Sequence, residues 1–248
     1  MTPDRMPRHG IARVLSKRGL CSRSEAARRV RDGRVQINGR RVLDPEFPCC
    51  ADDRILVDGA PLQNAQHVCI ALNKPRGLVT TASDEQGRDT VYRCIADVGV
   101  AWLAPVGRLD KASEGLLLLI SDPALAAAIT DPATGPDKTY HVQVDAIPDA
   151  LTLARIVAGM DVEGQFLHAT SATLLRHGKR NAWLEIVLDE GRNRHIRRLL
   201  AALDLNVLRL VRVAIGPVQL GTLAKAQWRR LTEAEIATLR PHDGADAA

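Results

Sequence analysis

The sequence has few aromatic residues and no long apolar run. Its 248 residues include two Tyr, two Phe and three Trp, and Phe47 is the only one of these in the first 67 residues. Stacking on single-stranded bases is therefore not expected to be the binding mode of this first part. No stretch approaches the length of a membrane span, and the first residues lack the apolar core of a secretory signal. These absences favour a cytoplasmic protein.

Cysteine-based sites and the common cofactor motifs are also missing. The five cysteines form no C-x-x-C pair and no zinc-type spacing with histidine, so free thiols in a reducing compartment are the simplest interpretation. The sequence contains no P-loop, no G-x-G-x-x-G, no H-E-x-x-H and no G-x-S-x-G. We therefore expect no cofactor and no metal.

The excess of positive charge is confined to the first quarter of the chain. Residues 1–67 hold 13 Lys and Arg against 8 Asp and Glu, whereas the remaining residues hold 21 of each. A compact basic module indicates an anionic partner, most often nucleic acid. Because only six of the 34 basic residues are Lys, a compositional bias toward Arg is an alternative explanation.

Local signals are clear in residues 9–43. Apolar residues at helical spacing predict a first helix that ends at Gly19. Ser22 and Glu25 form the pattern of a capping box for a second, Arg-rich helix that runs to about Asp32. Asn38-Gly39 between two short apolar-alternating runs predicts a β-hairpin. Residues 58–67 are interpreted as a linker.

From residue 68 onward the pattern mixes strands and helices without regular βαβ alternation, which predicts an α+β domain. The expected strands cover residues 68–73, 116–120, 138–144, 168–175, 183–188 and 207–213. The expected helices cover residues 90–95, 148–159 and 192–203, and another starts at 122–123.

Three segments carry candidate reactive groups. The first places Asp110 in a Gly-bounded loop that leads into the apolar strand 116–120, a rigid mount for a nucleophile or base, although from this segment alone an Asp in a surface turn is the favoured interpretation. The second places Tyr140 on the apolar face of a strand beside Lys138, where a core Tyr is the simpler interpretation. The third opens a helix with an apolar stripe, at whose edge Arg197 lies, whereas Arg194 and Arg198 are predicted on the solvent side.

Two resemblances connect these observations. Leu15-x-x-x-Gly19, Ser22-Arg23-Ser24-Glu25-Ala26 and Gly33-Arg34-Val35-x-Ile37-Asn38-Gly39 resemble an S4 RNA-binding domain over residues 9–65. Gly107-Arg108-Leu109-Asp110-x-x-Ser113-x-Gly115-Leu116, Lys138-x-Tyr140, Lys74-Pro75-x-Gly77 and the segment from Glu190 to Arg198 resemble the motifs of RsuA-like bacterial RNA pseudouridine synthases. The second resemblance implies an α+β protein in which the S4 module precedes a catalytic domain, residues 68–240, with a mixed and mainly antiparallel sheet.

The resemblances also imply roles for individual residues. Asp110 corresponds to the catalytic aspartate, Tyr140 to the tyrosine that stacks on the target uracil, and Arg197 to the basic residue that pairs with the aspartate. Lys74 corresponds to a mainly structural position, and His195 stands where the family usually has Gln or Glu. Leu116 and Leu117 are expected to form apolar walls of the site. The expected RNA contacts are Arg23, Arg28, Arg29, Arg34, Arg40, Arg108, Arg192 and Arg194, any one of which could instead be a solvated surface residue.

The implied reaction is the conversion of a uridine to pseudouridine in ribosomal RNA, with large-subunit 23S RNA favoured over small-subunit 16S RNA. We expect a monomer that acts on ribosomal RNA or on an assembling ribosomal subunit, with no membrane association. The alternative is an S4-type RNA-binding or ribosome-assembly factor without catalysis. Retention of Asp110, Tyr140 and Arg197 together favours the enzyme, because a non-catalytic relative would be expected to have lost at least one of them.

Overall fold

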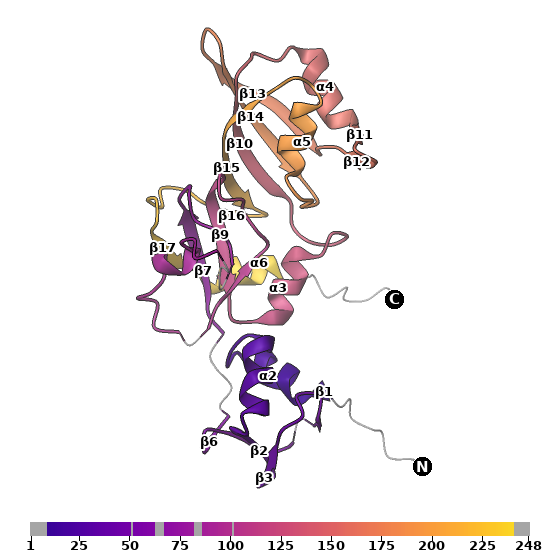
Figure 1. Ribbon diagram of the computed structural model, residues 1–248. Coiled ribbons are helices and arrows are strands. Elements are labelled where there is room, and N and C mark those ends of the chain that lie inside the picture. Colours follow the sequence, from indigo (N-terminus) through magenta and orange to yellow (C-terminus); the bar gives the residue numbers. More distant parts are fainter. Residues whose placement is uncertain (1–8, 51, 63–66, 82–85, 101, 241–248) are drawn as a thin grey trace, which may run out of the picture. The chain divides into compact units, whose positions relative to one another are not determined.

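The computed structural model describes residues 9–50, 52–62, 67–81, 86–100 and 102–240 (Figure 1). They divide into two compact units, the smaller made of the chain up to Val68 with residues 99–104 and 120–124, and the larger made of the rest. Since two short segments of the later chain group with the smaller unit, the boundaries at 9–65 and 68–240 stay a prediction. Within the described ranges, no helix is both long enough and apolar enough to cross a membrane.

The smaller unit combines two short helices with small antiparallel sheets. Its elements are β1 (His9–Gly10), α1 (Ile11–Lys17), α2 (Arg23–Arg31), β2 (Val35–Ile37), β3 (Arg40–Val42), β4 (Pro48–Cys49), β5 (Ile55–Val57) and β6 (Ala60–Pro61). Strand β1 pairs with β4, and the other four form a sheet in the order β3-β2-β5-β6. The apolar faces of both helices and of the sheet meet in one core, in which Ile11, Leu15, Val30 and Val35 are fully buried.

The start of α2 differs from the expected capping box. The hydroxyl of Ser22 accepts a hydrogen bond from the backbone N–H of Glu25 at 3.2 Å, as predicted. The Glu25 carboxylate does not return to the backbone of Ser22 but pairs with Arg28 and Arg29 one turn later. Only half of the box forms, because two guanidinium groups at helical spacing offer the carboxylate stronger partners than one backbone N–H.

Two tight turns shape the sheet of the smaller unit. Asn38 and Gly39 both have positive φ, at 50° and 80°, which confirms the predicted β2–β3 hairpin. Asp58 and Gly59 repeat this geometry and join β5 to β6. The interpretation of 58–67 as a linker is therefore wrong for its first residues, which form a turn and a short strand, while 63–66 lie outside the described residues.

The larger unit is built on a nine-stranded, mostly antiparallel sheet in the order β13-β14-β10-β15-β9-β7-β17, with β16 beside β15 and β8 beside β9. Its strands are β7 (Cys69–Lys74), β8 (Ala104–Val106), β9 (Glu114–Ile120), β10 (Lys138–Val144), β13 (Ser171–His177), β14 (Ala182–Leu188), β15 (Val207–Ile215), β16 (Val218–Gln219) and β17 (Trp228–Arg230). A separate hairpin pairs β11 (Met160–Val162) with β12 (Gln165–Leu167). The helices are η1 (Val91–Cys94), α3 (Pro123–Thr130), α4 (Ala150–Ala158), α5 (His195–Ala201) and α6 (Glu233–Leu239).

At the centre of this sheet, β9 and β15 pair in parallel. Gly115 of β9 faces Arg212 of β15, and a Cβ atom at Gly115 would lie 2.3 Å from the backbone oxygen of Arg212. Gly115 also has a φ of +103°, so both its conformation and the close approach require glycine. The last residue of the Gly-bounded loop therefore fixes how near β15 lies to the strand that follows Asp110.

Helix α5 is shorter than predicted, and its outer face is covered. It begins at His195 rather than at residue 192, because Arg194 adopts a left-handed conformation with φ of 51°. Arg198 does not lie in solvent: its guanidinium binds the side chain of Gln165 at 2.7 Å and the backbone oxygen of Val162 at 2.9 Å. In Figure 1, α4, α5 and the β11–β12 hairpin lie on one side of strands β13, β14 and β10.

Candidate active site

Hydrogen bonds from residues 74–80 hold the backbone of the loop that carries Asp110. The Nζ of Lys74, which is fully buried at the end of β7, donates to the backbone oxygens of Asp110 at 3.1 Å and of Ser113 at 2.8 Å. The hydroxyl of Thr80 donates to the backbone oxygen of Leu109 at 2.8 Å, and the N–H of Gly77 binds the oxygen of Lys111 at 2.8 Å. These bonds fix the backbone on both sides of the carboxylate, so the supporting role expected of Lys74 is confirmed.

Burial also affects the ionisation of Lys74. Removal from water lowers its pKa to about 8, although the nearby charge of Asp110 opposes this effect. The pKa of Lys74 therefore lies close to neutral pH. Its hydrogen bonds to carbonyl oxygens compensate the cost of burying the ammonium group.

A pocket of about 550 Å³ opens beside this loop. Asp110, Tyr140 and Arg197 all line it, so three motifs that are far apart in the sequence converge on one cavity. Its apolar lining includes Ile129, Leu188, Ile196, Leu210 and Ile215. A cavity of this size and mixed lining suits a small ligand or a single flipped nucleotide.

Leu116 and Leu117 do not form the walls of the pocket, contrary to expectation. Both are fully buried inside β9 and lie outside the lining of the cavity. The apolar run 116–120 is the centre of the sheet, with each face covered, and therefore supports the site from behind rather than contacting a ligand.

Arg197 is half-buried at the edge of the apolar stripe of α5, as helical geometry predicted. Its guanidinium donates to the backbone oxygens of Val207 and Ala112, both at 3.4 Å, and its Nε has no hydrogen-bond partner. Among the described residues, no ion pair within 4 Å joins it to Asp110. Burial is the main cause of the lowered pKa of Arg197, followed by the charge of Arg194, whereas Asp110 raises it. The two charges thus interact across the pocket without direct contact.

Sequence reasoning missed Arg212, which lines the same pocket and is only 4 % exposed. Its Cα atom is paired with that of Tyr140 across β10 and β15. A signal was available: in β15 the inward positions are occupied by Leu210, Arg212 and Ala214, so the arginine interrupts an apolar period-two pattern. A charged residue at a buried strand position requires a partner or a function.

His195 also enters the lining of the pocket and is 3 % exposed. Neither ring nitrogen has a hydrogen-bond partner, and the nearest carboxylate oxygen, on Glu190, lies 3.8 Å from Nδ1. Burial is the largest cause of the lowered pKa of His195, which favours the neutral imidazole. The other oxygen of Glu190 accepts a hydrogen bond from Arg192 at 2.8 Å.

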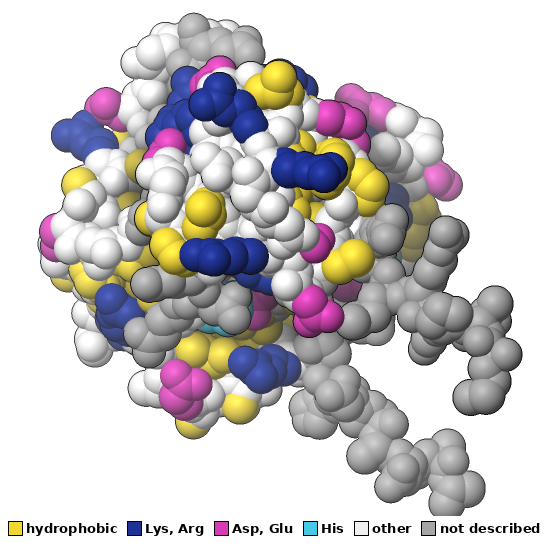
Figure 2. Space-filling model, turned by 90° about the horizontal axis from the view of Figure 1, so that it is seen from below, with side chains coloured by type: hydrophobic (Ala, Val, Ile, Leu, Met, Phe, Trp, Pro, Cys, Tyr) yellow, Lys and Arg dark blue, Asp and Glu magenta, His cyan; other side chains and the backbone are white. Residues whose placement is uncertain are grey.

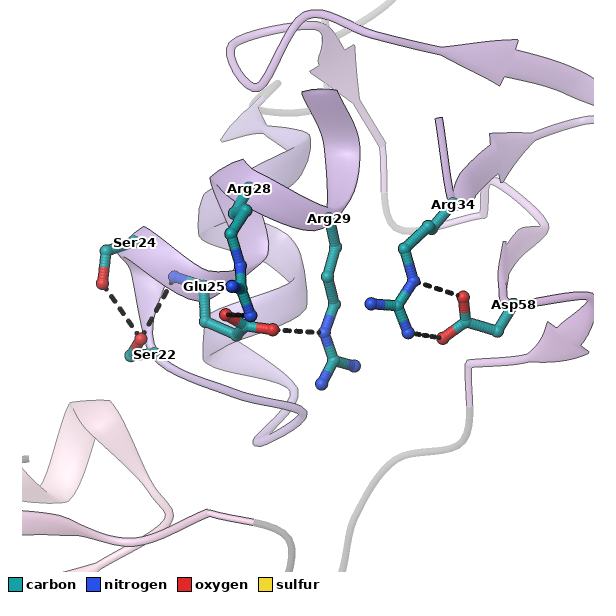
Figure 3. Close-up of polar contacts among 7 residues, drawn as sticks. All are labelled: Ser22, Ser24, Glu25, Arg28, Arg29, Arg34 and Asp58. Atoms are coloured by element: carbon teal, nitrogen blue, oxygen red, sulfur yellow. Dashed lines mark hydrogen bonds and ion pairs between the residues drawn. The ribbon is translucent and has the colours of Figure 1, made fainter. Parts of the chain in front are cut away.

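The arginines expected to contact RNA in the smaller unit are mostly engaged in exposed ion pairs. Figure 3 shows Arg28 and Arg29 converging on Glu25, and Arg34 in a bidentate contact with Asp58 at 2.6 and 2.7 Å. The hydrogen bonds from Arg34 lower the pKa of Asp58, and those from Arg28 and Arg29 lower that of Glu25. Each carboxylate therefore holds a guanidinium in a fixed position at the surface.

The remaining expected contacts lie in different surroundings. Arg23 pairs with Glu46 at 3.2 Å, and Arg40 is exposed on β3. Figure 2 shows basic side chains spread among apolar and acidic ones on the face it presents, rather than merged into one continuous patch. Arg108, Arg192 and Arg194 belong to the larger unit, where all three line the pocket. The candidate RNA contacts are thus distributed over both units.

No group of three or more His, Cys, Asp or Glu in the described part of the chain is arranged to hold a metal ion. The titratable side chains of the pocket are instead dominated by cations, which surround Asp110 and Glu190. Such an arrangement attracts an anionic ligand.

Comparison with known proteins gives consistent results for both units. Residues 67–202 match the family described as RNA pseudouridylate synthase, and residues 10–67 match the S4 domain. An uncharacterised RNA pseudouridine synthase of Aquifex aeolicus is 36 % identical over 236 residues, which cover 92 % of each chain. The ribosomal large subunit pseudouridine synthase B of Bacillus subtilis is 31 % identical over 93 % of this chain and 95 % of its own. A crystal structure of a pseudouridylate synthase superposes with a TM-score of 0.67 at 28 % identity and covers 94 % of this chain and all of that one.

Proposed function

Because this chain belongs to the RNA pseudouridylate synthase family and carries an S4 domain, we propose that it converts a specific uridine of large-subunit ribosomal RNA to pseudouridine. The observation that carries the proposal is the convergence of Asp110, Tyr140 and Arg197 on one pocket. The relative from Bacillus subtilis, named for the large ribosomal subunit, supports the choice of RNA.

The reaction is an isomerisation and needs no co-reactant. The bond between N1 of the uracil and C1′ of the ribose breaks, the base turns, and C5 becomes bonded to C1′. The proton released from C5 is balanced by the proton gained at N1. A cofactor is therefore not required by the chemistry, and the protein must supply a nucleophile, an acceptor for the C5 proton and a way to hold the detached base.

In this proposal, Asp110 supplies the carboxylate that attacks the nucleotide while Lys74 and Thr80 hold its loop in place. Arg197 supplies a positive charge that interacts with Asp110 in the pocket. Tyr140 packs against the flipped uracil and takes part in removing the C5 proton. The target base must leave its stack to enter the pocket, and Arg108 at the pocket rim replaces it or binds a phosphate.

The S4 domain anchors the RNA through phosphate contacts from its arginines, so affinity should fall steeply with salt. We propose that the enzyme acts as a monomer in the cytoplasm, on ribosomal RNA or an assembling subunit.

The deciding measurement is tritium release from ribosomal RNA that carries 5-tritiated uridine, with wild type and Asp110→Asn side by side. We expect release by the wild type alone, from 23S RNA in preference to 16S RNA. Mapping of pseudouridine would then locate the modified position.

Two other results would change the proposal. Release from 16S RNA alone would keep the reaction and replace the substrate. No release from naked RNA and from precursor subunits alike would leave a non-catalytic S4-type RNA-binding protein.

A further inference from the structure

Arg212 is a buried cation of the pocket, only 4 % exposed. Its Nε donates to the backbone oxygen of Leu116 at 2.7 Å, and its Nη2 is buried without any hydrogen-bond partner. No ion pair within 4 Å joins it to a described acidic residue. An unpartnered guanidinium nitrogen in a low-dielectric site is costly, since both its charge and its hydrogen-bonding capacity are unsatisfied. An orphaned buried group of this kind calls for an explanation, and a bound ion or ligand that completes its hydrogen bonds is one.

Lys138 is a second cation in the same part of the pocket. It starts β10, two residues before Tyr140, and its Nζ donates to the backbone oxygen of Asp189 at 3.1 Å. Burial is the largest cause of the lowered pKa of Lys138, and the charge of Arg212 is the next, so the two cations lie close enough to repel each other. Like Arg212, it has no carboxylate within ion-pair distance among the described residues.

Backbone contacts fix the position of the Arg212 side chain. Gly115 allows the backbone of β15 to approach β9 closely at this residue, and the bond to Leu116 fixes the guanidinium plane. The charged group is thus preorganised before any ligand arrives, which reduces the entropy lost on binding. Tyr140, the expected stacking partner of the base, is its cross-strand neighbour.

We propose that Arg212 and Lys138 form a phosphate subsite that binds a backbone phosphate adjoining the flipped uridine. This inference rests on the proposed function. A phosphate fits better than a uracil carbonyl, because only an anion offsets the charge of a buried guanidinium and of a half-buried ammonium group beside it. Guanidinium and ammonium groups together also match the several acceptor oxygens of a phosphodiester.

The first experiment compares wild type with Arg212→Gln, Arg212→Lys and Lys138→Gln by tritium release at varied RNA concentration. The matched control is Arg155→Gln, which replaces an exposed arginine on α4 outside the pocket. We expect Arg212→Gln to lower kcat/KM about 10- to 100-fold, as for the loss of a charge-assisted hydrogen bond. Lys138→Gln should have a smaller effect, Arg212→Lys should restore part of the loss, and the control should match the wild type.

Thermal unfolding of the same variants separates binding from structural support. If Arg212 served only to bind the backbone of Leu116, Arg212→Gln would lower the melting temperature, and its activity would recover on cooling. The proposal predicts that the loss of kcat/KM in Arg212→Gln persists well below its melting temperature, whatever the cost of the lost bond to Leu116.

The second experiment places a single neutral methylphosphonate on either side of the modified uridine in an RNA fragment that the wild type modifies. Neutralising one of the two phosphates should slow the wild type strongly and should slow Arg212→Gln no further, since the subsite is already lost. Equal slowing of both proteins at both positions would overturn the subsite while leaving the pseudouridine synthase function intact. Absence of tritium release by the wild type from any RNA would instead overturn the proposed function, and the subsite with it.

Discussion

The arginines of the two units are held in opposite ways. In the smaller unit, Arg28, Arg29 and Arg34 are fixed at the surface by Glu25 and Asp58. In the pocket of the larger unit, Arg197 and Arg212 are partly or fully buried, and neither has a carboxylate within ion-pair distance among the described residues. Under the proposed function, these are two different ways to bind an anionic partner. An arginine in an exposed ion pair can exchange its carboxylate for a phosphate at little cost in free energy. A buried arginine without a carboxylate gains its partner only when an anionic ligand binds.

The comparison predicts that changes in the smaller unit will alter RNA affinity and its salt dependence, while changes in the pocket will alter turnover. Mutations that remove one charge in each unit can test this division.

The largest effect is expected for Asp110→Asn, which removes the carboxylate that lines the pocket from the loop that Lys74 and Thr80 hold rigid. Single-turnover tritium release should fall by on the order of a thousandfold or more, because loss of a nucleophile is not compensated by binding. RNA affinity measured by filter binding should remain near that of the wild type. The matched control, Asp52→Asn, neutralises an exposed carboxylate of the smaller unit and should leave the rate unchanged. A rate for Asp110→Asn within tenfold of the wild type would contradict the assignment.

A smaller effect concerns stability and the buried Lys74. Its pKa of about 8 in the folded chain lies below its ordinary value of 10.5, so the unfolded chain binds more protons between these values. The free energy of unfolding should therefore rise with pH in this window. Relative to Lys74→Met, the wild type should gain about 2 kcal/mol between about pH 7.5 and about pH 9.5.

Urea denaturation at both pH values measures this difference. Lys179→Met, which replaces an exposed lysine, should show no such change relative to the wild type. If the difference in the free energy of unfolding between the wild type and Lys74→Met did not depend on pH, Lys74 would not be desolvated in solution.

The cap of α2 should contribute less. Ser22→Ala removes the acceptor of the Glu25 N–H and should destabilise the protein by about 1 kcal/mol. Ser24→Ala leaves this bond in place and should cost less than about 0.5 kcal/mol. Chemical denaturation monitored by circular dichroism distinguishes them. Equal losses would indicate that Glu25 is fixed by its arginines rather than by the cap.

The smallest effect is expected at the surface pair of the smaller unit. Arg34→Gln should weaken RNA binding about threefold and reduce the slope of log affinity against log salt by about 1, with kcat unchanged. Part of the loss arises because Asp58 is left without its partner and repels RNA. The double variant Arg34→Gln/Asp58→Asn should therefore bind more tightly than the single one. If Arg34→Gln changed kcat instead, the proposed division between the two units would be wrong.

The sequence predicted most of the framework because its signals are local. The end of the first helix near Gly19 and the hairpin at Asn38-Gly39 both follow from the backbone conformation of these residues alone. The strand 138–144 appears with its predicted bounds, since apolar alternation reports directly on burial. The motif resemblances brought Asp110, Tyr140 and Arg197 together, and the pocket contains all three.

What sequence reasoning missed depends on contacts between distant segments. Arg198 was expected in solvent because helical geometry cannot foresee that the β11–β12 hairpin covers that face. Arg212 was not predicted, because its burial depends on β10 and β9, which pair with β15 on either side. Leu116 and Leu117 are behind the site because a strand that is apolar on both faces lies at the centre of a sheet.

The parallel pairing of β9 with β15 has a consequence for how the chain folds. Val211 meets Glu114 only after roughly a hundred intervening residues have been brought into place, so this contact carries a high entropic cost of loop closure. The β13–β14 hairpin, by contrast, joins neighbouring strands and can form early. We therefore expect amide protection to develop in β13 and β14 before β9 during refolding, with catalytic competence among the last properties to be acquired.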